Sequence, residues 1–263
     1  NYVTTSLRVA IVMKAKEIAA IIEEFAPLSL QEGWDNAGFS VGDSNQEVTS
    51  VLVALDCTPE LILEAVELGA NMIITHHPLI FGGVKKITFD NVVGRSIQLA
   101  IQNNIVLYSA HTNADKVWVS KLMAERLNLE NVSPLDESLI GVVGDLSCEM
   151  DSKEFVERVK SVFSLKSIRY SQPLEQKIRR VALCGGSGKS MINASIANGA
   201  QAYITGDIPY HEFFCRDNYM ILDIGHYESE IDFVENIISI LKKKISNFAI
   251  YNTTKNNNPI YYI

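Results

Sequence analysis

The chain has 263 residues, of which 47% are apolar, and this length suits one large α/β domain or two smaller lobes. Its formal net charge of −8, with a sequence pI of about 5.2 and no basic stripe, disfavours nucleic acid as a partner. Four widely spaced cysteines without a Cys-x-x-Cys pair argue against a structural zinc finger or a disulfide framework, and they favour the reduced cytoplasm. No apolar stretch is long enough to cross a bilayer, so we expect no membrane partner.

Residues 1–12 resemble a signal peptide only weakly, because their apolar part is short and no small-residue cleavage site follows it. Met13-Lys14 resembles a natural start. We therefore expect residues 1–12 to be a leader or a segment added to the natural start.

The next part of the chain predicts alternating helices and strands. In chain order we expect a helix over residues 14–26, a turn-rich loop over 31–38, a strand over 51–56, a helix ending at 69, a strand over 71–75, a helix over about 91–103 and a strand over 105–110. Thr58 should cap the second helix, since Pro59 after it tolerates the loss of its N–H at the first helical position.

The rest of the chain repeats this plan. The segment from Gly69 to Thr75 resembles the segment from Gly199 to Thr205 at a spacing of 130 residues, and each follows a Val-Ala-Leu strand and a helix. Further elements are expected as a strand over 141–146, a helix opened by Asp151 and Glu154 in a capping-box pattern, a helix over about 228–245 and a strand over 248–253. We infer an internal duplication with halves 13–130 and 131–263, which form one compact unit without an independent linker.

Histidines and carboxylates follow the strand-like runs of both halves. His76-His77 follows the run over 71–75, His111 follows the run over 105–110, and His226 follows the run over 219–225. Asp115 and Glu230 come four residues after His111 and His226, so each pair shares one face if a helix begins at the histidine. Because strand ends of an open α/β sheet converge on one crevice, six such ligands predict a two-metal site between two α/β lobes.

Other interpretations of these residues stay open. Adjacent residues on a strand point to opposite faces, so one of His76 and His77 could be buried and the other exposed, unless the strand ends there, as Pro78 suggests. Each carboxylate could also serve a helix dipole. Asp207 occupies the repeat position of His77, and with His211 it could orient ligands without binding the metal; for His211 a surface or helix-cap role is equally open.

The segment from Cys184 to Ser190 reads Cys-Gly-Gly-Ser-Gly-Lys-Ser, which resembles a phosphate-binding P-loop. That motif requires glycine at position 183, which is leucine here. We therefore expect Gly185 and Gly186 to allow a close backbone approach, with amides that could bind an anionic substrate group. Cys184 is expected to be a small buried thiol rather than a nucleophile.

Together these motifs resemble the dinuclear-metal family called GTP cyclohydrolase I type 2 homologues, or Nif-three-like proteins. The resemblance covers residues 13–255 and rests on the following segments: Gly33-Trp-Asp-Asn36, Thr75-His-His-Pro-Leu79, His111-Thr-Asn-Ala-Asp115, Cys184-Gly-Gly-Ser-Gly188, Thr205-Gly-Asp207, and Gly225-His226 with Glu230. It implies two related α/β lobes in a short form without an extra domain, a hexameric ring, and a two-metal site with the six ligands named above. Asp35 and Asn36 become candidates for supporting the site or its substrate loop. The chain departs from the family after Asp115, where it reads Lys116-Val-Trp-Val-Ser instead of a glycine pair.

Two functions follow as expectations. The first is a metallohydrolase acting on a nucleotide-like or other small molecule, with GTP ring opening implied by the family name only. No catalytic side chain is identified; a metal-bound hydroxide is the expected nucleophile, and Asp115 and Glu230 are the expected bridges. The second is a non-catalytic metal-binding or regulatory assembly protein. Nitrogen and oxygen ligands without thiolate fit zinc, iron, manganese or cobalt.

Overall fold

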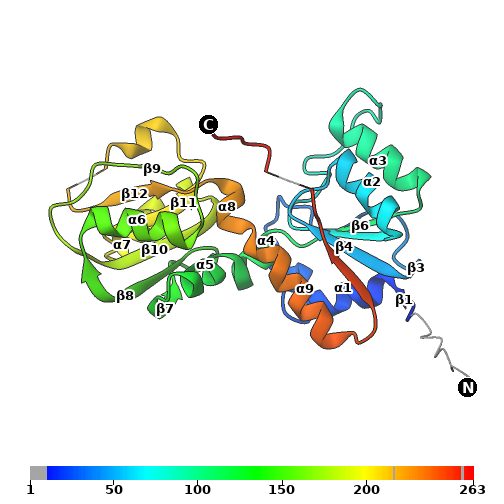
Figure 1. The fold of residues 1–263 in the computed structure, drawn as a ribbon, viewed down its shortest axis with the longest axis horizontal. Coiled ribbons are helices and arrows are strands. Elements are labelled where there is room, and N and C mark those ends of the chain that lie inside the picture. The colour runs from blue at the N-terminus through cyan, green and yellow to red at the C-terminus, as the bar shows by residue number, and fades with distance from the viewer. Residues whose placement is uncertain (1–10, 216, 256–257) are drawn as a thin grey trace, which may run out of the picture. The chain divides into compact units, whose positions relative to one another are not determined.

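A computed structural model describes residues 11–215, 217–255 and 258–263, so most of the expected leader lies outside the described residues (Figure 1). The chain divides into two compact units. Among the described residues, unit 1 comprises 11–28, 34–110 and 234–255, and unit 2 comprises 29–33, 111–215, 217–233 and 258–263. Each unit contains its own sheet, and the two are described separately below.

Unit 1 is built on a five-stranded sheet of order β13-β4-β5-β6-β2. All neighbours in this sheet are parallel except β2, which pairs antiparallel with β6. Its elements are β1 (Met13–Lys14), α1 (Ala15–Glu23), β2 (Gly38–Val41), β3 (Glu47–Val48), β4 (Ser50–Ala54), α2 (Pro59–Leu68), β5 (Met72–Thr75), α3 (Val92–Gln102), β6 (Val106–Ser109), α9 (Asp232–Lys244, which begins in unit 2) and β13 (Ala249–Asn252).

Helices cover both faces of this sheet. Every residue of β4, β5 and β6 is buried, as expected for central strands of a parallel sheet. Leu52, Ile73 and Leu107 point to one face and pack with residues of α2 and α3. Figure 1 shows α1 and α9 on the opposite face. Unit 1 therefore has the three-layer α/β architecture that the alternating pattern predicts.

Unit 2 is built on a six-stranded sheet of order β7-β8-β10-β11-β12-β9. Its elements are α4 (Thr112–Ala114), the π-helix η2 (Asp115–Val119), α5 (Ser120–Arg126), β7 (Glu130–Pro134), β8 (Val142–Met150), α6 (Ser152–Val162), β9 (Arg169–Tyr170), β10 (Ile178–Ser187), the 3₁₀ helix η3 (Lys189–Met191), α7 (Ile192–Ala197), β11 (Ala202–Gly206), the 3₁₀ helix η4 (Tyr210–Phe213), β12 (Met220–Asp223) and α8 (His226–Glu230). A short 3₁₀ helix, η1 (Leu28–Leu30), crosses from unit 1 into unit 2.

The side chains of β10 alternate between two apolar layers. Val181 and Leu183 pack with α5 and α6, whereas Ala182 and Cys184 pack with η3 and α7. This two-residue period places a separate core on each face of the sheet. Unit 2 is thus also a three-layer α/β unit.

The two sheets share one topology. In unit 1 the parallel strands β4, β5 and β6 are flanked by the antiparallel β2, and in unit 2 the parallel β10, β11 and β12 are flanked by the antiparallel β9. In both units the antiparallel strand precedes the parallel set in the chain. The α/β class is therefore confirmed, and the matching strand orders support the inferred duplication.

The outer strands and the last connection differ between the units. The helix α3 of unit 1 corresponds to the short η4 in unit 2, and β10 has the antiparallel β8 beside it where β4 has the parallel β13. The strand expected over 248–253 is present as β13, and it pairs with β4 of unit 1.

Two expected helix starts can be compared with the structure. The Thr58 hydroxyl accepts a hydrogen bond from the N–H of Leu61 at 3.2 Å, so the predicted cap of α2 is confirmed. Asp151 occupies the N-cap position of α6, but its side chain makes no capping hydrogen bond. The expectation of a capping box at Asp151 and Glu154 was therefore wrong.

Candidate metal centre

The carboxyl ends of three parallel strands meet at one edge of the unit 1 sheet. Ala54 at the end of β4 pairs with Thr75 at the end of β5, and Thr75 pairs with Ser109 at the end of β6. The residues directly beyond these ends are therefore neighbours, and they include Asp56 and the pair His76-His77.

A tight turn fixes the histidine pair. The backbone N–H groups of His76 and His77 both donate to the carbonyl of Leu55, at 3.1 and 3.0 Å. The Thr75 hydroxyl donates to the carbonyl of His77 at 2.8 Å. β5 has ended by this point, so the alternation that would separate the two side chains no longer applies. Their ring centroids lie 4.9 Å apart.

Each ring of the pair has a partner for its Nδ1 atom. His76 is fully buried, and its Nδ1–H donates to the carbonyl of Ala110 at 2.8 Å. The Nδ1 atom of His77 lies 2.7 Å from Oδ1 of Asp56. A proton held on Nδ1 leaves Nε2 as the nitrogen that would bind a metal, and such partners are typical of metal-binding histidines. Sequence reasoning missed Asp56, although its place at the end of the expected strand 51–56 was the available signal.

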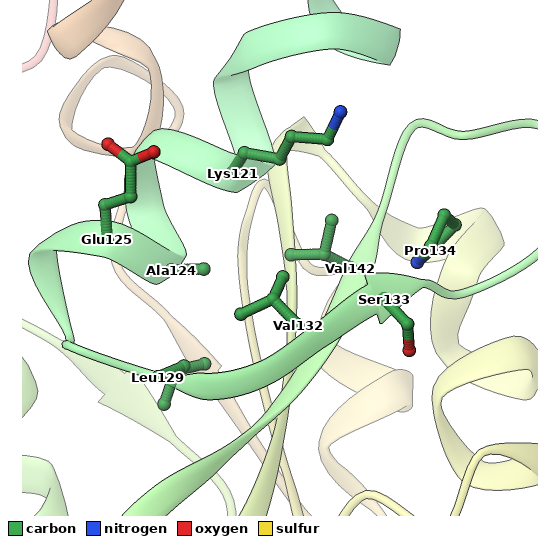
Figure 2. Close-up of a pocket in the computed structure, with 8 residues that line it drawn as sticks. All are labelled: Lys121, Ala124, Glu125, Leu129, Val132, Ser133, Pro134 and Val142. Carbon is green, nitrogen blue, oxygen red and sulfur yellow. The ribbon is translucent and has the colours of Figure 1, made fainter.

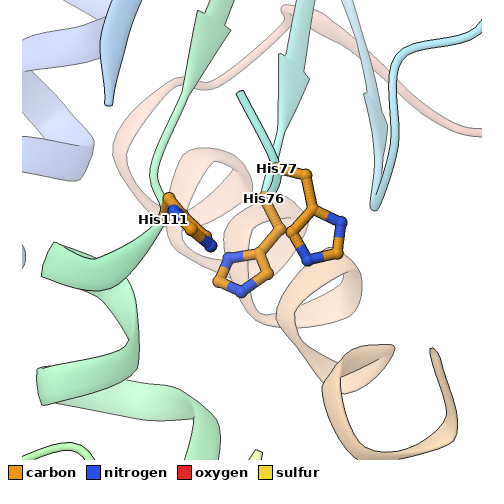
Figure 3. A group of neighbouring side chains, drawn as sticks. All are labelled: His76, His77 and His111. Atoms are coloured by element: carbon orange, nitrogen blue, oxygen red, sulfur yellow. The ribbon is translucent and has the colours of Figure 1, made fainter. Parts of the chain in front are cut away.

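His111 completes a group of three histidines. It follows Ala110, whose N–H donates to the carbonyl of Thr75 at 3.0 Å, so the end of β6 brings the chain to the histidine pair. One ring nitrogen from each of His76, His77 and His111 lies within 4.8 Å of the other two, and Figure 3 shows the three rings together. These three residues form a candidate metal-binding group.

His226 and Glu230 lie together in unit 2. Helix α8 begins at His226, two residues before the helix expected over about 228–245, and this meets the condition under which the four-residue spacing places the pair on one face. Nε2 of His226 lies 3.1 Å from Oε2 of the buried Glu230. Nδ1 of the same ring lies 2.7 Å from Oδ2 of Asp207. Asp207 thus orients a predicted ligand, which is one of the two roles considered from the sequence. Burial lowers the pKa of His226, but Glu230 and Asp207 outweigh it and raise this pKa to about 9.

The glycine turn after β10 packs directly against this pair. A Cβ atom on Gly186 would overlap Oε1 of Glu230 and approach Cε1 of His226 to 3.4 Å, and a Cβ on Gly185 would overlap Val119. The amide N–H of Gly186 donates to the Ser229 hydroxyl at 2.9 Å, and that of Gly185 donates to the Ser120 hydroxyl at 3.2 Å. The close backbone approach expected here is present. The sequence also suggested that these amides could bind an anionic group, but both already donate hydrogen bonds within the protein.

We expect Gly186→Ala to destabilise the protein markedly. Gly186 has a left-handed backbone with φ of +62°, which costs an L-residue about 1–2 kcal/mol, and the overlap with Glu230 adds to this cost. Urea unfolding measures the change. Gly199→Ala is the control in the same unit, because Gly199 is also left-handed but its nearest atom would lie 3.9 Å away. Equal losses in the two variants would contradict the claim that close packing requires Gly186.

The chain forms a π-helix where it departs from the family pattern. Asp115 follows α4 and begins η2, and the N–H of Asp115 donates to the carbonyl of His111 at 2.9 Å. Lys116, the next residue, forms an ion pair with Glu32 at 2.6 Å. A π-helical turn is rare and is found frequently at functional sites. The local loop shape that the sequence left open is thus a helical turn that continues into α5.

The other candidate residues lie as follows. Asn36 donates through Nδ2 to the carbonyl of Ile80 at 2.6 Å and through its backbone N–H to Oδ1 of Asp35 at 2.7 Å, so both residues belong to the loop that holds the segment after His77. His211 is exposed on η4 and stacks on Phe214 with ring centroids 6.5 Å apart. The surface role considered for His211 matches this position.

Two further residues of the glycine-rich segment, Lys189 and Cys184, have partners or packing contacts within the protein. Lys189 forms an ion pair with Glu212 at 2.8 Å. Cys184 is buried, and burial together with the nearby Asp115 raises the pKa of its thiol to about 12. Cys184 is therefore a packing residue rather than an activated nucleophile.

A separate cavity of about 310 Å³ lies between α5 and β7 in unit 2 (Figure 2). Its walls are mainly aliphatic, from Ala124, Leu129, Val132 and Val142, with Lys121 and Glu125 also lining it. No predicted ligand is among its lining residues, so this cavity is distinct from the candidate metal centre.

The donor atoms present suit divalent transition metals. The three histidines of Figure 3 offer imidazole nitrogen, and Asp115 and Glu230 offer carboxylate oxygen, without thiolate. The turn at Gly186 also keeps Glu230 and His226 free of a Cβ overlap. These residues therefore fit a metal of the zinc, iron, manganese or cobalt type.

Two α/β units with a shared topology and a histidine group at a sheet edge define an α/β protein with candidate metal-binding groups. The chain belongs to the Duf34/NIF3 (NGG1p interacting factor 3) family, whose model matches residues 13–259. This match confirms the family resemblance inferred from the motifs.

Relatives and solved structures agree with this assignment. A Clostridium perfringens protein named GTP cyclohydrolase 1 type 2 homolog is 40% identical over 245 residues, which cover 89% of this chain and 93% of the relative. A Staphylococcus aureus hypothetical protein has a TM-score of 0.87 at 30% identity, covering 95% of this chain and 99% of that one. Reduced HcgD from Methanocaldococcus jannaschii has a TM-score of 0.81 at 30% identity, covering 94% and 100%.

The membrane expectation concerns helices alone. Among the helices of the described residues, none has both the length and the apolar character needed to span a membrane.

Proposed function

We propose that this protein is a metal-dependent hydrolase that holds two divalent metal ions. The proposed ligands are the histidines and carboxylates at the strand ends: His76, His77, His111, Asp115, His226 and Glu230. Asp115 and Glu230 are the proposed bridges, because a carboxylate has two oxygen atoms to share between two ions.

One observation carries the proposal: the proposed ligands His76, His77 and His226 each have a partner on Nδ1. The partners are the Ala110 carbonyl for His76, Asp56 for His77 and Asp207 for His226. Each partner fixes the ring so that Nε2 is available to a metal, and two of them are carboxylates that make the ring a stronger donor. A histidine that served only core packing would not require such repeated orientation.

The proposed substrate is a small nucleotide-like molecule. The relatives' name, GTP cyclohydrolase 1 type 2 homolog, suggests hydrolytic ring opening, and family membership alone does not fix that reaction. A bound divalent ion would supply a Lewis acid and lower the pKa of water. The contribution of Asp56 and Asp207 would be to hold His77 and His226 in one orientation and keep the proton on Nδ1.

The first test is metal content. Protein purified without chelator and supplied in turn with zinc, iron(II), manganese and cobalt should contain about two ions per chain, ~4 Å apart as in other two-metal sites. Elemental analysis with anomalous scattering measures both quantities. At most one ion per chain under every metal would overturn the dinuclear proposal.

The second test separates catalysis from metal binding alone. Metal-dependent turnover of GTP or of another member of a nucleotide library would support the hydrolase. Two bound ions with no turnover across the library would instead support a non-catalytic metal-binding or regulatory assembly protein.

We also propose a hexameric ring in the cytoplasm, as the family resemblance implies, with a small-molecule substrate and no nucleic-acid or membrane partner. The net charge of −8 supports the exclusion of nucleic acid. Light scattering after size-exclusion chromatography measures the assembly, and a mass other than six chains would contradict the ring.

A further inference from the structure

Asp223 is a buried carboxylate in unit 2 that none of the motifs predicts as functional. It is the last residue of β12, and only 5% of the residue is exposed. Its neighbour in the sheet is Thr205, near the end of β11. This position places Asp223 next to the segment after β11, which carries Asp207, and the segment after β12, which leads to His226.

The two oxygen atoms of Asp223 bind one peptide in each loop. Oδ2 accepts a hydrogen bond from the N–H of Ile208 at 2.9 Å, and Oδ1 accepts one from the N–H of Gly225 at 3.0 Å. Ile208 directly follows Asp207, and Gly225 directly precedes His226. One carboxylate therefore connects the backbones on both sides of the Asp207–His226 hydrogen bond.

Both loops have unusual backbone conformations at these points. Asp207 is left-handed with φ of +54°, and Gly225 has φ of +93°. A left-handed backbone is unfavourable for an aspartate, and a glycine can adopt many backbone conformations. Surrounding contacts are therefore needed to hold Asp207 and Gly225 in these conformations. The two hydrogen bonds to Asp223 are contacts of this kind.

Arg169 completes the arrangement. Its Nη2 atom forms an ion pair with Oδ2 of Asp223 and also donates to the carbonyl of Ile208 at 3.1 Å. Its guanidinium group lies over the ring of Phe213, 5.4 Å from the centroid. The positive charge offsets part of the cost of burying the Asp223 carboxylate.

We propose that Asp223 is a positioning residue that sets the distance and orientation between Asp207 and His226 and so prepares His226 to bind metal. The inference rests on the proposed function, in which His226 is a ligand. Asp223 acts through the backbone of the two loops and touches neither the metal nor the substrate.

The test compares Asp223→Asn with Asp145→Asn. An asparagine side chain has one oxygen and one NH₂ group, so one of the donors that now meets an oxygen of Asp223 would meet an NH₂ group instead. The two loops should therefore lose their alignment. Asp145 also pairs with an arginine in this sheet, Arg180 at 2.9 Å, but it lies on β8 beside the start of β10, away from the loops that follow β11 and β12. Affinity for Zn²⁺ is measured by competition with a chelator, and stability is measured by urea unfolding.

We expect Asp223→Asn to weaken Zn²⁺ binding 10–100-fold, the range typical for loss of a partner that orients a ligand. Asp145→Asn should lose stability and keep wild-type affinity. A nitrogen chemical-shift change at Nδ1 of His226 in the metal-free Asp223→Asn protein would mark the altered hydrogen bond to Asp207, which a general loss of stability would not produce.

The outcomes separate the two proposals. Wild-type protein that binds none of zinc, iron(II), manganese and cobalt would overturn the proposed function itself. Wild-type binding with an equal affinity in Asp223→Asn would overturn the positioning role alone. If Asp223→Asn fails to fold, Asp223→Glu replaces it, because glutamate keeps the charge but moves the oxygens by one methylene; unchanged affinity in that variant would equally overturn the role.

Discussion

Asp115→Ala and Glu230→Ala should each lower metal occupancy at two positions, whereas His226→Ala should mainly weaken one. The reason is that a bridging carboxylate binds both ions of a two-metal site, and an imidazole nitrogen binds one. Anomalous difference maps on the three variants, combined with elemental analysis, measure the occupancy of each position.

Glu228→Ala is the matched control for these variants. Glu228 lies on the same helix as Glu230, but its Oε1 accepts a hydrogen bond from Asn258 at 2.9 Å. It should retain both ions. If each carboxylate variant instead empties one position and leaves the other full, the bridging roles are wrong, and two separate mononuclear sites explain the ligands better.

Replacing Glu64 with alanine should destabilise unit 1 by about 1.5–3 kcal/mol, the usual contribution of hydrogen bonds to a charged group. Glu64 lies on α2 and is 3% exposed. Its carboxylate accepts hydrogen bonds from the Thr253 hydroxyl at 2.5 Å, from the Thr254 hydroxyl at 2.6 Å and from the Thr254 N–H at 2.7 Å. These bonds hold the segment just after β13. Urea unfolding measures the loss, and Glu67→Ala, on the exposed side of the same helix, should be close to neutral.

The same carboxylate predicts an acid-sensitive contribution to stability. Burial acts to raise the pKa of Glu64, but the hydrogen bonds from Thr253 and Thr254 and the charge of Lys255 hold it below its ordinary value of 4.5. A pKa that is lower in the folded protein stabilises it above pH 4.5, and this stabilisation is lost as the pH falls through the folded value. Glu64→Gln should therefore be less stable than the wild type at pH 7 and approach it in acid. A constant difference across the pH range would contradict this account.

The fold could be predicted well wherever one strand or helix has a clear local period. The parallel strands β4, β5 and β6 consist of continuous apolar residues, and the repeat between Gly69–Thr75 and Gly199–Thr205 indicates two related units. The partner of β13 could not be predicted, because the choice of a neighbouring strand depends on contacts far apart in the chain. The prediction of a capping box at Asp151 was wrong because these residue types allow the capping hydrogen bond but do not require it.

In the candidate site, too, residues with a local sequence signal could be predicted and residues that depend on distant contacts could not. His76, His77 and His111 could be placed together because they follow strands that pair in register, and the His226–Glu230 contact follows from helical spacing. Apart from Asp207, the residues that orient these histidines could not be predicted from the sequence. Asp56 had only its place at the end of an expected strand as a signal, and Asp223 is identified only once the register of neighbouring strands is known. The reason for Gly186 is visible only when Glu230 lies against it.

The strand β13 has a consequence for how the protein folds during synthesis. Ala249 of β13 pairs with Ser50 of β4, so the sheet of unit 1 gains that edge strand only after all strands of unit 2 have been made. The strands of unit 2 all come from the continuous segment between Glu130 and Asp223. Pairing between distant segments is slow, because the long intervening loop must be closed first. Unit 2 should therefore complete its sheet on the ribosome before unit 1 completes its own. Nascent chains that stop before residue 249 should protect unit 2 from proteases while leaving the β4 edge of unit 1 open.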